Sequence, residues 1–222
     1  GPVIKIYNGA NPAAIKEDSY TDEEITALKT ELGKKPGEVW LVNTARLVHQ
    51  KAFDVVIRSL VHLPTHVKFL VVGQGEDELM LRKLTNELRL TDRVIFTGHV
   101  DRGVVTKYRL VSDIFVMPSR SEGLGNASLS ARASRLPFIT TAIDGMTEHS
   151  FATDAESPFG RTAWVVPVDD PEAIATAVED ILAHPEEAKR VADNARKMVV
   201  EVYNWDVIAE RMRTEIFNRL CI

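Results

Sequence analysis

The sequence predicts an α/β protein built on a six-stranded, doubly wound parallel sheet with helices on both faces. The first observation behind this prediction is a set of six short runs that are rich in β-branched and aromatic residues. These runs are continuously apolar, as parallel strands are when both faces of their sheet are covered. The predicted strands are Val39–Thr44, Val67–Val72, Val94–Thr97, Ile114–Met117, Phe138–Ala142 and Ala163–Val166.

The second observation is that helical patterns fall between the strands. Apolar residues recur there at the spacing i, i+3, i+4, i+7, which marks one buried face of a helix. A last helix is predicted from Trp205 to about Leu220. The four clearest stripes are Phe53, Val56, Ile57, Leu60 and Val61; Leu81, Leu84 and Leu88; Ile174, Ala177, Val178, Ile181 and Leu182; and Val191, Ala195, Met198, Val199 and Val202.

Helix start signals complete the pattern. The segment from Thr21 to Glu24 has the form of a capping box and opens a helix that should run through Leu32. Asp170 followed by Pro171 is a second start, with proline at the first helical position. The chain has no internal repeat, low-complexity tract or long linker. One Rossmann-like domain with right-handed crossovers is therefore predicted over 21–222, with extra helices at its C-terminal end.

Composition and charge narrow the class of protein. Of 222 residues 45% are hydrophobic and 27% charged, which is ordinary for a soluble globular protein. The net charge of −5 disfavours a nucleic-acid-binding surface, which would need a basic face. The single cysteine, Cys221, permits no disulfide framework and favours a reducing, cytoplasmic location. We find no signal peptide and no apolar run near the ~20 residues that span a bilayer.

The chain begins with Gly1 and Pro2 in place of methionine. We interpret this start as a cleavage scar or as the edge of an excised fragment. On that interpretation, residues 1–20 are a linker that leads in from a domain upstream.

Ligands of open α/β sheets bind at the carboxyl ends of the strands, near the point where the strand order reverses. The loop after the first predicted strand carries Arg46 and Lys51, and the loop after the second carries Gly73 and Gly75. The loop after the fourth carries Glu122, followed by two glycines. Two cations, two glycine turns and a carboxylate at one edge of a sheet suit an anionic ligand with phosphates and hydroxyls.

The strand–turn–helix segment 114–135 carries the sharpest prediction. Gly123 and Gly125 let backbone N–H groups approach a ligand, and a helix that starts near Asn126 and runs to Arg135 adds the positive end of its dipole. Glu122 precedes both glycines and can accept hydrogen bonds from hydroxyls. The alternative is a plain strand-to-helix turn.

Other signals have ordinary interpretations. Gly73 and Gly75 lack the third glycine of a dinucleotide-binding loop, because Glu78 stands there, so a tight turn is favoured. Arg46 and Lys51 taken alone could be solvated charges. Trp40 and Trp164 are predicted to be core residues, and His49 and His99 to be surface loop residues. The histidine spacing predicts no metal site, and the chain has neither a G-x-S-x-G elbow nor a Walker A motif.

The segment SRSEGLGNASLSARASRLPFITT at 119–141 resembles the signature of the retaining glycosyltransferases of family 4. The resemblance covers nearly the whole chain. It extends over IYNGAN at 6–11, TARLVHQKAFDVVIRSL at 44–60, VVGQGEDELMLRKL at 71–84, VIFTGHV at 94–100 and VPVDDPEAIATAVEDIL at 166–182. It implies one half of a two-domain GT-B fold, namely the C-terminal domain that binds a nucleoside diphosphate sugar.

By this resemblance, Arg46 and Lys51 face the donor diphosphate and Glu122 contacts hydroxyls of the transferred sugar. The loop around Phe96–Gly98 lies near the base, and Gly73 and Gly75 can approach the base or the ribose. The backbone that holds the sugar and phosphate is that of Gly123, Leu124, Gly125, Asn126 and Ala127.

Two positions depart from the family pattern. Ser130 stands where the family has a glutamate that binds the ribose, and Arg135 stands where a small residue, usually glycine, precedes Leu-Pro. The first departure bears on ribose recognition, and the second on packing at the helix end.

The expected function is transfer of a sugar, with retention and without an essential metal or cofactor, to an acceptor hydroxyl. A polysaccharide, lipopolysaccharide or glycoconjugate pathway is implied. The acceptor (a glycan, lipid or small molecule) and any peripheral membrane contact would belong to a missing N-terminal domain, so this chain alone should be inactive. One rival is a related GT-B epimerase or phosphorylase. Another is a non-catalytic sugar-nucleotide-binding module, which Ser130 favours.

Overall fold

The computed structural model describes residues 6, 8–10, 20–101, 103–123, 125–143, 146–147 and 149–217. Cys221, Leu220, Leu124 and most of 1–20 lie outside these ranges. The structure therefore does not describe most of the predicted linker or the last residues of the chain.

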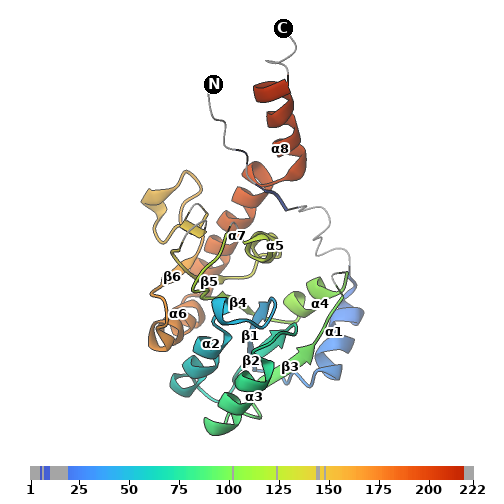
Figure 1. Ribbon diagram of the computed structural model, residues 1–222, viewed down its shortest axis with the longest axis vertical. Helices are drawn as coiled ribbons and strands as arrows, with labels where there is room; N and C mark the ends of the chain where they lie inside the picture. The colour runs from blue at the N-terminus through green and yellow to red at the C-terminus, as the bar shows by residue number, and fades with distance from the viewer. Residues whose placement is uncertain are drawn as a thin grey trace.

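The six predicted strands form a single parallel sheet in the order β3-β2-β1-β4-β5-β6 (Figure 1). Three strands have the predicted bounds, and the other three differ by one residue. β3 continues to Gly98 because a register shift after Val71 brings Val72 opposite that glycine. The strands are β1 Val39–Thr44, β2 Val67–Val72, β3 Val94–Gly98, β4 Ile114–Met117, β5 Phe138–Thr141 and β6 Trp164–Val166.

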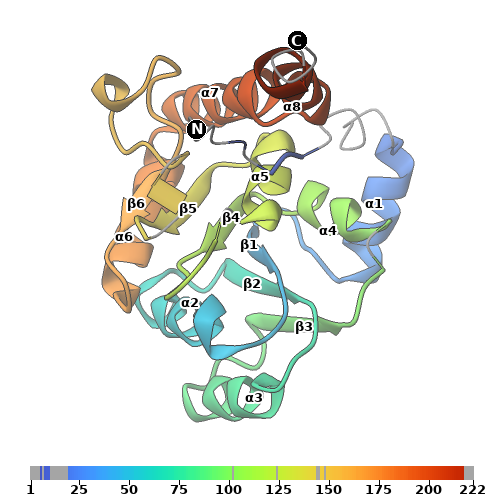
Figure 2. The same cartoon turned by 45° about the horizontal axis from the view of Figure 1, so that its top comes forward.

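Helices cover both faces of this sheet, as Figure 2 shows. The first core lies under α2 (Phe53–Ser59), α3 (Glu78–Glu87) and α6 (Pro171–Ala183). The second core lies on the opposite face, under α1 (Asp22–Glu31) and α4 (Val105–Leu110). Trp164 belongs to the first core and Trp40 to the second, which confirms both core predictions.

Two of the remaining helices form a third core beside the sheet. α5 (Asn126–Ala133) packs against α7 (Pro185–Val202), and α8 (Trp205–Met212) follows α7. α7 also contributes Ala188 and Val191 to the first core. The short 3₁₀ helices are η3 (His49–Lys51), η4 (Leu60–His62) and η6 (Asp154–Glu156). In the part of the chain that is described, no helix is both long and apolar enough to cross a membrane.

Both predicted helix starts are confirmed. The Thr21 hydroxyl accepts from the Glu24 N–H at 3.2 Å, and the Glu24 carboxylate accepts from the Thr21 N–H at 3.0 Å, which completes the capping box. At the start of α6 the Asp170 carboxylate accepts from the Ala173 N–H at 2.8 Å, with Pro171 at the first helical position.

The last helix was expected to run to about Leu220. It is an α-helix to Met212 and a π-helix over Arg213–Phe217, and the expected end lies outside the described residues. One other predicted helix end is corrected. α5 was expected to reach Arg135 and ends at Ala133. Arg135 takes a left-handed φ of 54°, and the proline after Leu136 disfavours helical backbone, so the helix stops there.

Candidate functional site

The strand order reverses between β1 and β4, and the sheet opens at that point. β1 pairs with β2 along six residues, but it pairs with β4 only through Leu41–Ile114 and Val42–Phe115. The carboxyl ends of β1 and β4 therefore separate beyond Val42. Such a separation produces the crevice in which doubly wound sheets bind their ligands.

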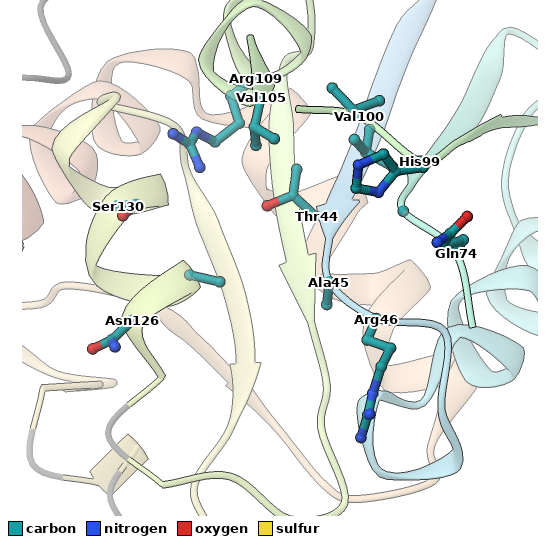
Figure 3. A pocket seen from close by; sticks show the side chains of 13 residues that line it. Thr44, Ala45, Arg46, Gln74, His99, Val100, Val105, Arg109, Asn126 and Ser130 are labelled. Carbon is teal, nitrogen blue, oxygen red and sulfur yellow. The ribbon is translucent and has the colours of Figure 1, made fainter. Parts of the chain in front are cut away.

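A cavity of about 780 Å³ occupies this crevice (Figure 3). Its walls come from the ends of β1 and β2, the segment after β3, α4 and the first turns of α5. The lining residues are Thr44, Ala45, Arg46, Val72, Gly73, Gln74, His99, Val100, Val105, Arg109, Asn126, Ala127 and Ser130. The volume is within the range typical of small-molecule sites, about 300–1,000 Å³.

Several buried polar atoms at this edge of the sheet have no hydrogen-bond partner among the described residues. They are both side-chain amide atoms of Asn43, the Thr44 hydroxyl and the Ser119 hydroxyl. Asn43 and Thr44 end β1, and Ser119 follows β4 by two residues. Buried polar groups are normally hydrogen-bonded, so these atoms are candidates to bind a ligand or water.

Two features of the cavity suit an anion. Arg46 is exposed in its wall and has no side-chain partner in the described part of the chain. Asn126 and Ala127 begin α5 and also line the cavity. They follow Gly125, which has a left-handed φ of 68°. Among the residues that the structure describes, no side chain caps the first turn of α5, so its N–H groups and the positive end of the helix dipole are available to a ligand.

Lys51 and Glu122 do not line the cavity but form an ion pair with each other through Lys51 Nζ and Glu122 Oε2. Their side chains are 22% and 13% exposed, so the pair is partly desolvated. The structure thus joins two predicted site residues that are 71 positions apart in sequence. Each side chain keeps further hydrogen-bonding capacity, because an ammonium has three donors and a carboxylate two acceptor oxygens.

Arg120 fixes the loops that carry this pair, and the sequence did not single it out. Its guanidinium donates to both Asp54 carboxylate oxygens at 2.9 and 2.8 Å, to Asp169 at 2.7 Å and to the His49 carbonyl at 2.7 Å. Its backbone N–H donates to the Gln50 carbonyl at 2.8 Å. The hydrogen bond to Asp54 is the main cause that raises the pKa of Arg120, against a smaller effect of burial.

Gly73 and Gly75 lie where the loop after β2 packs against the loop after β1. Gly73 forms a bridge with Gly98, and the turn that was expected at the glycines lies at Glu76 and Asp77. A Cβ at Gly73 would overlap the Ala45 carbonyl oxygen, and a Cβ at Gly75 would overlap the Leu47 carbonyl oxygen. Leu47 N–H donates to the Gln74 carbonyl at 3.0 Å, so the loops after β1 and β2 are bonded together. Gly73 lines the cavity, while Gly75 lies behind the Arg46 loop.

Phe96, Gly98 and Gly123 are not among the residues that line the cavity. Phe96 is inside β3 rather than in a loop, and its ring packs on the first core at 4.3 Å from Arg82 Cζ. Gly98 ends β3 and its carbonyl accepts from the Gly73 N–H at 3.1 Å. Gly123 has open space around the position of a Cβ.

The far wall contains one predicted residue and several that the sequence did not single out. Ser130 lines the cavity one turn after Asn126, on the face that their spacing of four predicted. His99 also lines it, although the sequence favoured a plain surface position; its side chain is 67% exposed. Arg109 was missed because α4 is too short for a clear helical pattern. Within the described ranges, no group of three or more His, Cys, Asp or Glu residues is placed to hold a metal ion.

The strand order and the cavity at its reversal point define a doubly wound α/β domain of the kind that binds nucleotides at the carboxyl ends of its strands. The family model of Glycosyl transferases group 1 matches residues 24–198. This match covers more than half of the chain, and the protein belongs to that family.

Curated relatives agree with this assignment. An uncharacterized glycosyltransferase of Methanocaldococcus jannaschii is 29% identical over 210 residues, which cover 92% of this chain and 51% of that protein. The GDP-mannose-dependent alpha-(1-6)-phosphatidylinositol monomannoside mannosyltransferase of Mycolicibacterium smegmatis is 29% identical over 198 residues, which cover 85% of this chain and 49% of that protein. The chain thus spans about half the length of the curated relatives it matches.

Solved structures share the fold. The Anabaena protein HepE, crystallised in complex with UDP, has a TM-score of 0.85 at 17% identity, over 96% of this chain and 57% of that one. Sucrose-phosphate synthase from Thermosynechococcus elongatus has a TM-score of 0.81 at 25% identity, over 97% of this chain and 52% of that one. The predicted fold class, a Rossmann-like half of a GT-B glycosyltransferase, is confirmed.

Proposed function

We propose that this chain is the donor-binding domain of a glycosyltransferase that transfers a sugar from a nucleoside diphosphate sugar to an acceptor hydroxyl. The observation that carries the proposal is the cavity at the reversal point, with the exposed Arg46 and the uncapped start of α5 in its wall. A leaving diphosphate gains negative charge as the glycosidic bond breaks. Fixed donors aimed at such developing charge are typically worth about 3–4 kcal/mol each.

The ion pair of Lys51 and Glu122 gives the sugar end of this site its chemistry. In our proposal Lys51 adds a positive charge toward the diphosphate, and the free oxygen of Glu122 accepts from sugar hydroxyls. The pair orients each group before the donor arrives, since Arg120 ties the two loops together. The backbone of Gly123, Asn126 and Ala127 would hold the phosphate, and the segment from Gly98 to Val100 would face the base.

Two properties of related proteins support the choice of ligand. HepE was crystallised with UDP, UDP with glucose, and UDP-glucose, and the Mycolicibacterium relative is named as GDP-mannose-dependent. These ligands are nucleoside diphosphate sugars or the nucleoside diphosphates of such sugars. We extend that class of donor to this chain and leave the base and the sugar to experiment.

The experiment is isothermal titration calorimetry of this chain with UDP, GDP and ADP, followed by sugar derivatives of whichever nucleotide binds. We expect one nucleoside diphosphate to bind weakly, the sugar derivative to bind through Glu122 as well, and no sugar to be transferred by this chain alone. Binding of none of the three diphosphates would refute the donor-site assignment. Sustained transfer by the isolated chain would refute the need for a second domain.

The full reaction belongs to the whole protein. We propose retention of configuration, an acceptor carried by an N-terminal domain, a cytoplasmic location and no essential metal. Anomeric NMR of the product made by the whole protein tests retention, and addition of a chelator tests the metal. A second candidate, a sugar-nucleotide-binding module without turnover, is favoured by Ser130, which puts a short neutral side chain in the cavity wall. Donor binding without any product from the whole protein would select it.

A further inference from the structure

Arg109 is a buried cation in the wall of the cavity. It lies near the end of α4 and is 5% exposed, yet it is one of the lining residues. Figure 3 shows its guanidinium pointing from α4 into the space toward α5, while Arg46 lies on the other side of the cavity. The cavity is therefore bordered by a positive charge on each side.

The hydrogen bonds of Arg109 are incomplete. One terminal nitrogen, Nη2, donates to the Thr106 hydroxyl at 3.0 Å, and Nε is buried with no partner in the described ranges. Among the described residues, no carboxylate forms a salt bridge with Arg109. Burial lowers the pKa of Arg109 to about 10, with a smaller opposing effect of Tyr20, so the guanidinium remains charged at neutral pH. An unpaired buried charge is costly.

Arg132 shows how this chain treats a buried arginine that is structural. It is fully buried, and it donates to the Ser128 hydroxyl at 3.2 Å and the Ser150 hydroxyl at 2.7 Å. It also donates to the Thr162 carbonyl at 2.9 Å, and its guanidinium lies 4.2 Å from the centre of the Phe138 ring. Arg132 is thus engaged through all three nitrogens and does not line the cavity. Arg109 differs on both points.

We propose that Arg109 is a ligand-binding residue that takes an oxyanion group of the ligand, a phosphate or a carboxylate, in the space between α4 and α5. A guanidinium is a donor only, and its geometry matches the paired oxygens of such groups. The Ser130 hydroxyl, in the facing wall, supplies another donor. This subsite lies in the same cavity as the proposed function. Only the identity of the molecule that carries the anion rests on that function.

The test compares the wild type with Arg109→Met, which keeps an unbranched side chain of similar length and removes the charge. Arg58→Met is the matched control, because Arg58 is exposed on α2 and has no partner in the described structure. Each protein is melted with and without inorganic phosphate and titrated with UDP and with uridine. Because the unpaired charge is removed, Arg109→Met should melt no lower than the wild type without ligand.

We expect phosphate to raise the melting temperature of the wild type and of Arg58→Met, and Arg109→Met to lose more than half of that rise. Uridine binding should not change. A fall of about tenfold or more in UDP affinity would identify the anion as the diphosphate of the donor. Unchanged UDP affinity with a lost phosphate response would identify a separate anion. Both outcomes support the subsite.

A second variant tests the same point from α5. Ser130→Glu adds a carboxylate to the wall that faces Arg109, so it should pair with the guanidinium, abolish the phosphate response and not lower the melting temperature. The proposal is overturned if neither the phosphate response nor the UDP affinity depends on Arg109. It is also overturned if Arg109→Met lowers the melting temperature and uridine affinity together, as a structural arginine would. Phosphate binding through Arg109 without binding of any nucleoside diphosphate would instead refute the proposed function and keep this subsite.

Discussion

Replacing Arg120 with glutamine should detach the loop after β4 from the loop after β1. The substitution removes two bonds to Asp54, one to Asp169 and one to the His49 carbonyl. The side chains of Arg120 and Asp54 are 16% and 21% exposed, so Asp54 would keep a partly desolvated and unpaired charge.

The size of the effect follows from these exposures. Hydrogen bonds to charged groups in partly buried sites contribute about 1.5–3 kcal/mol. Asp169 is 54% exposed, and its salt bridge with Arg120 should contribute under about 1 kcal/mol. We therefore expect Arg120→Gln to lower the free energy of unfolding by about 2–3 kcal/mol. For a chain of this size that is a fall of about 4–12 °C in melting temperature.

Urea denaturation of Arg120→Gln, Asp54→Asn and the double variant gives the coupling energy between the two side chains, which we expect to be about 1–2 kcal/mol. Arg58→Gln, which removes an exposed arginine from α2, should change the free energy of unfolding by less than about 0.5 kcal/mol. Binding of the donor nucleotide should also weaken in Arg120→Gln, because Lys51 and Glu122 lose their fixed separation. A coupling energy near zero would refute the role of Arg120 as the clamp of these loops.

Four further predictions concern other groups. Burial raises the pKa of Glu38, but three hydrogen bonds outweigh it and lower that pKa from 4.5 to about 2. The resulting stabilisation, up to about 3 kcal/mol, is present above pH 4.5 and is lost as the pH falls toward 2. Urea denaturation across this pH window should show the loss in the wild type and not in Glu38→Gln. By calorimetry, Lys51→Ala should weaken nucleoside diphosphate binding about tenfold. Glu122→Gln should weaken binding of the sugar nucleotide and spare the free nucleotide; equal losses would count against its role. Arg135→Gly should raise the melting temperature by about 1–3 °C. The left-handed backbone of Arg135 costs about 1–2 kcal/mol, and its exposed salt bridge with Asp193 at 3.5 Å contributes less stabilisation than that. A lower melting temperature would show that the pair outweighs the backbone.

The sheet could be predicted because its signals are local. Each buried strand is a continuous apolar run, and helix starts such as Thr21 and Asp170 carry side chains that cap their own backbone. Helix ends were less predictable, since the end of α5 depends on the left-handed Arg135 and on the proline that follows Leu136.

The sequence predicted which loops carry the site residues, but it did not predict the contacts between their side chains. Placing Arg46 in the cavity wall needs only the rule that parallel strands end at one edge, and placing Ser130 there needs its helical spacing from Asn126. The pairing of Lys51 with Glu122 needs the relative position of two loops, and that depends on Arg120, whose partners lie 49 to 71 positions away. Arg109 could not be found from its spacing, because what sets it apart is burial with its Nε left without a hydrogen-bond partner in the described structure.

The close approach of Gly73 and Gly75 to the carbonyls of Ala45 and Leu47 divides the cavity into a wall that can vary and one that cannot. Any side chain at either glycine would push the Arg46 loop away from β2, so a randomised library there would yield mostly misfolded clones. His99, Val100 and Val105 line the same cavity, and each of them is at least partly exposed. New donor preferences, in nature or in directed evolution, should therefore arise on the side of β3 and α4, while the glycine side remains unchanged.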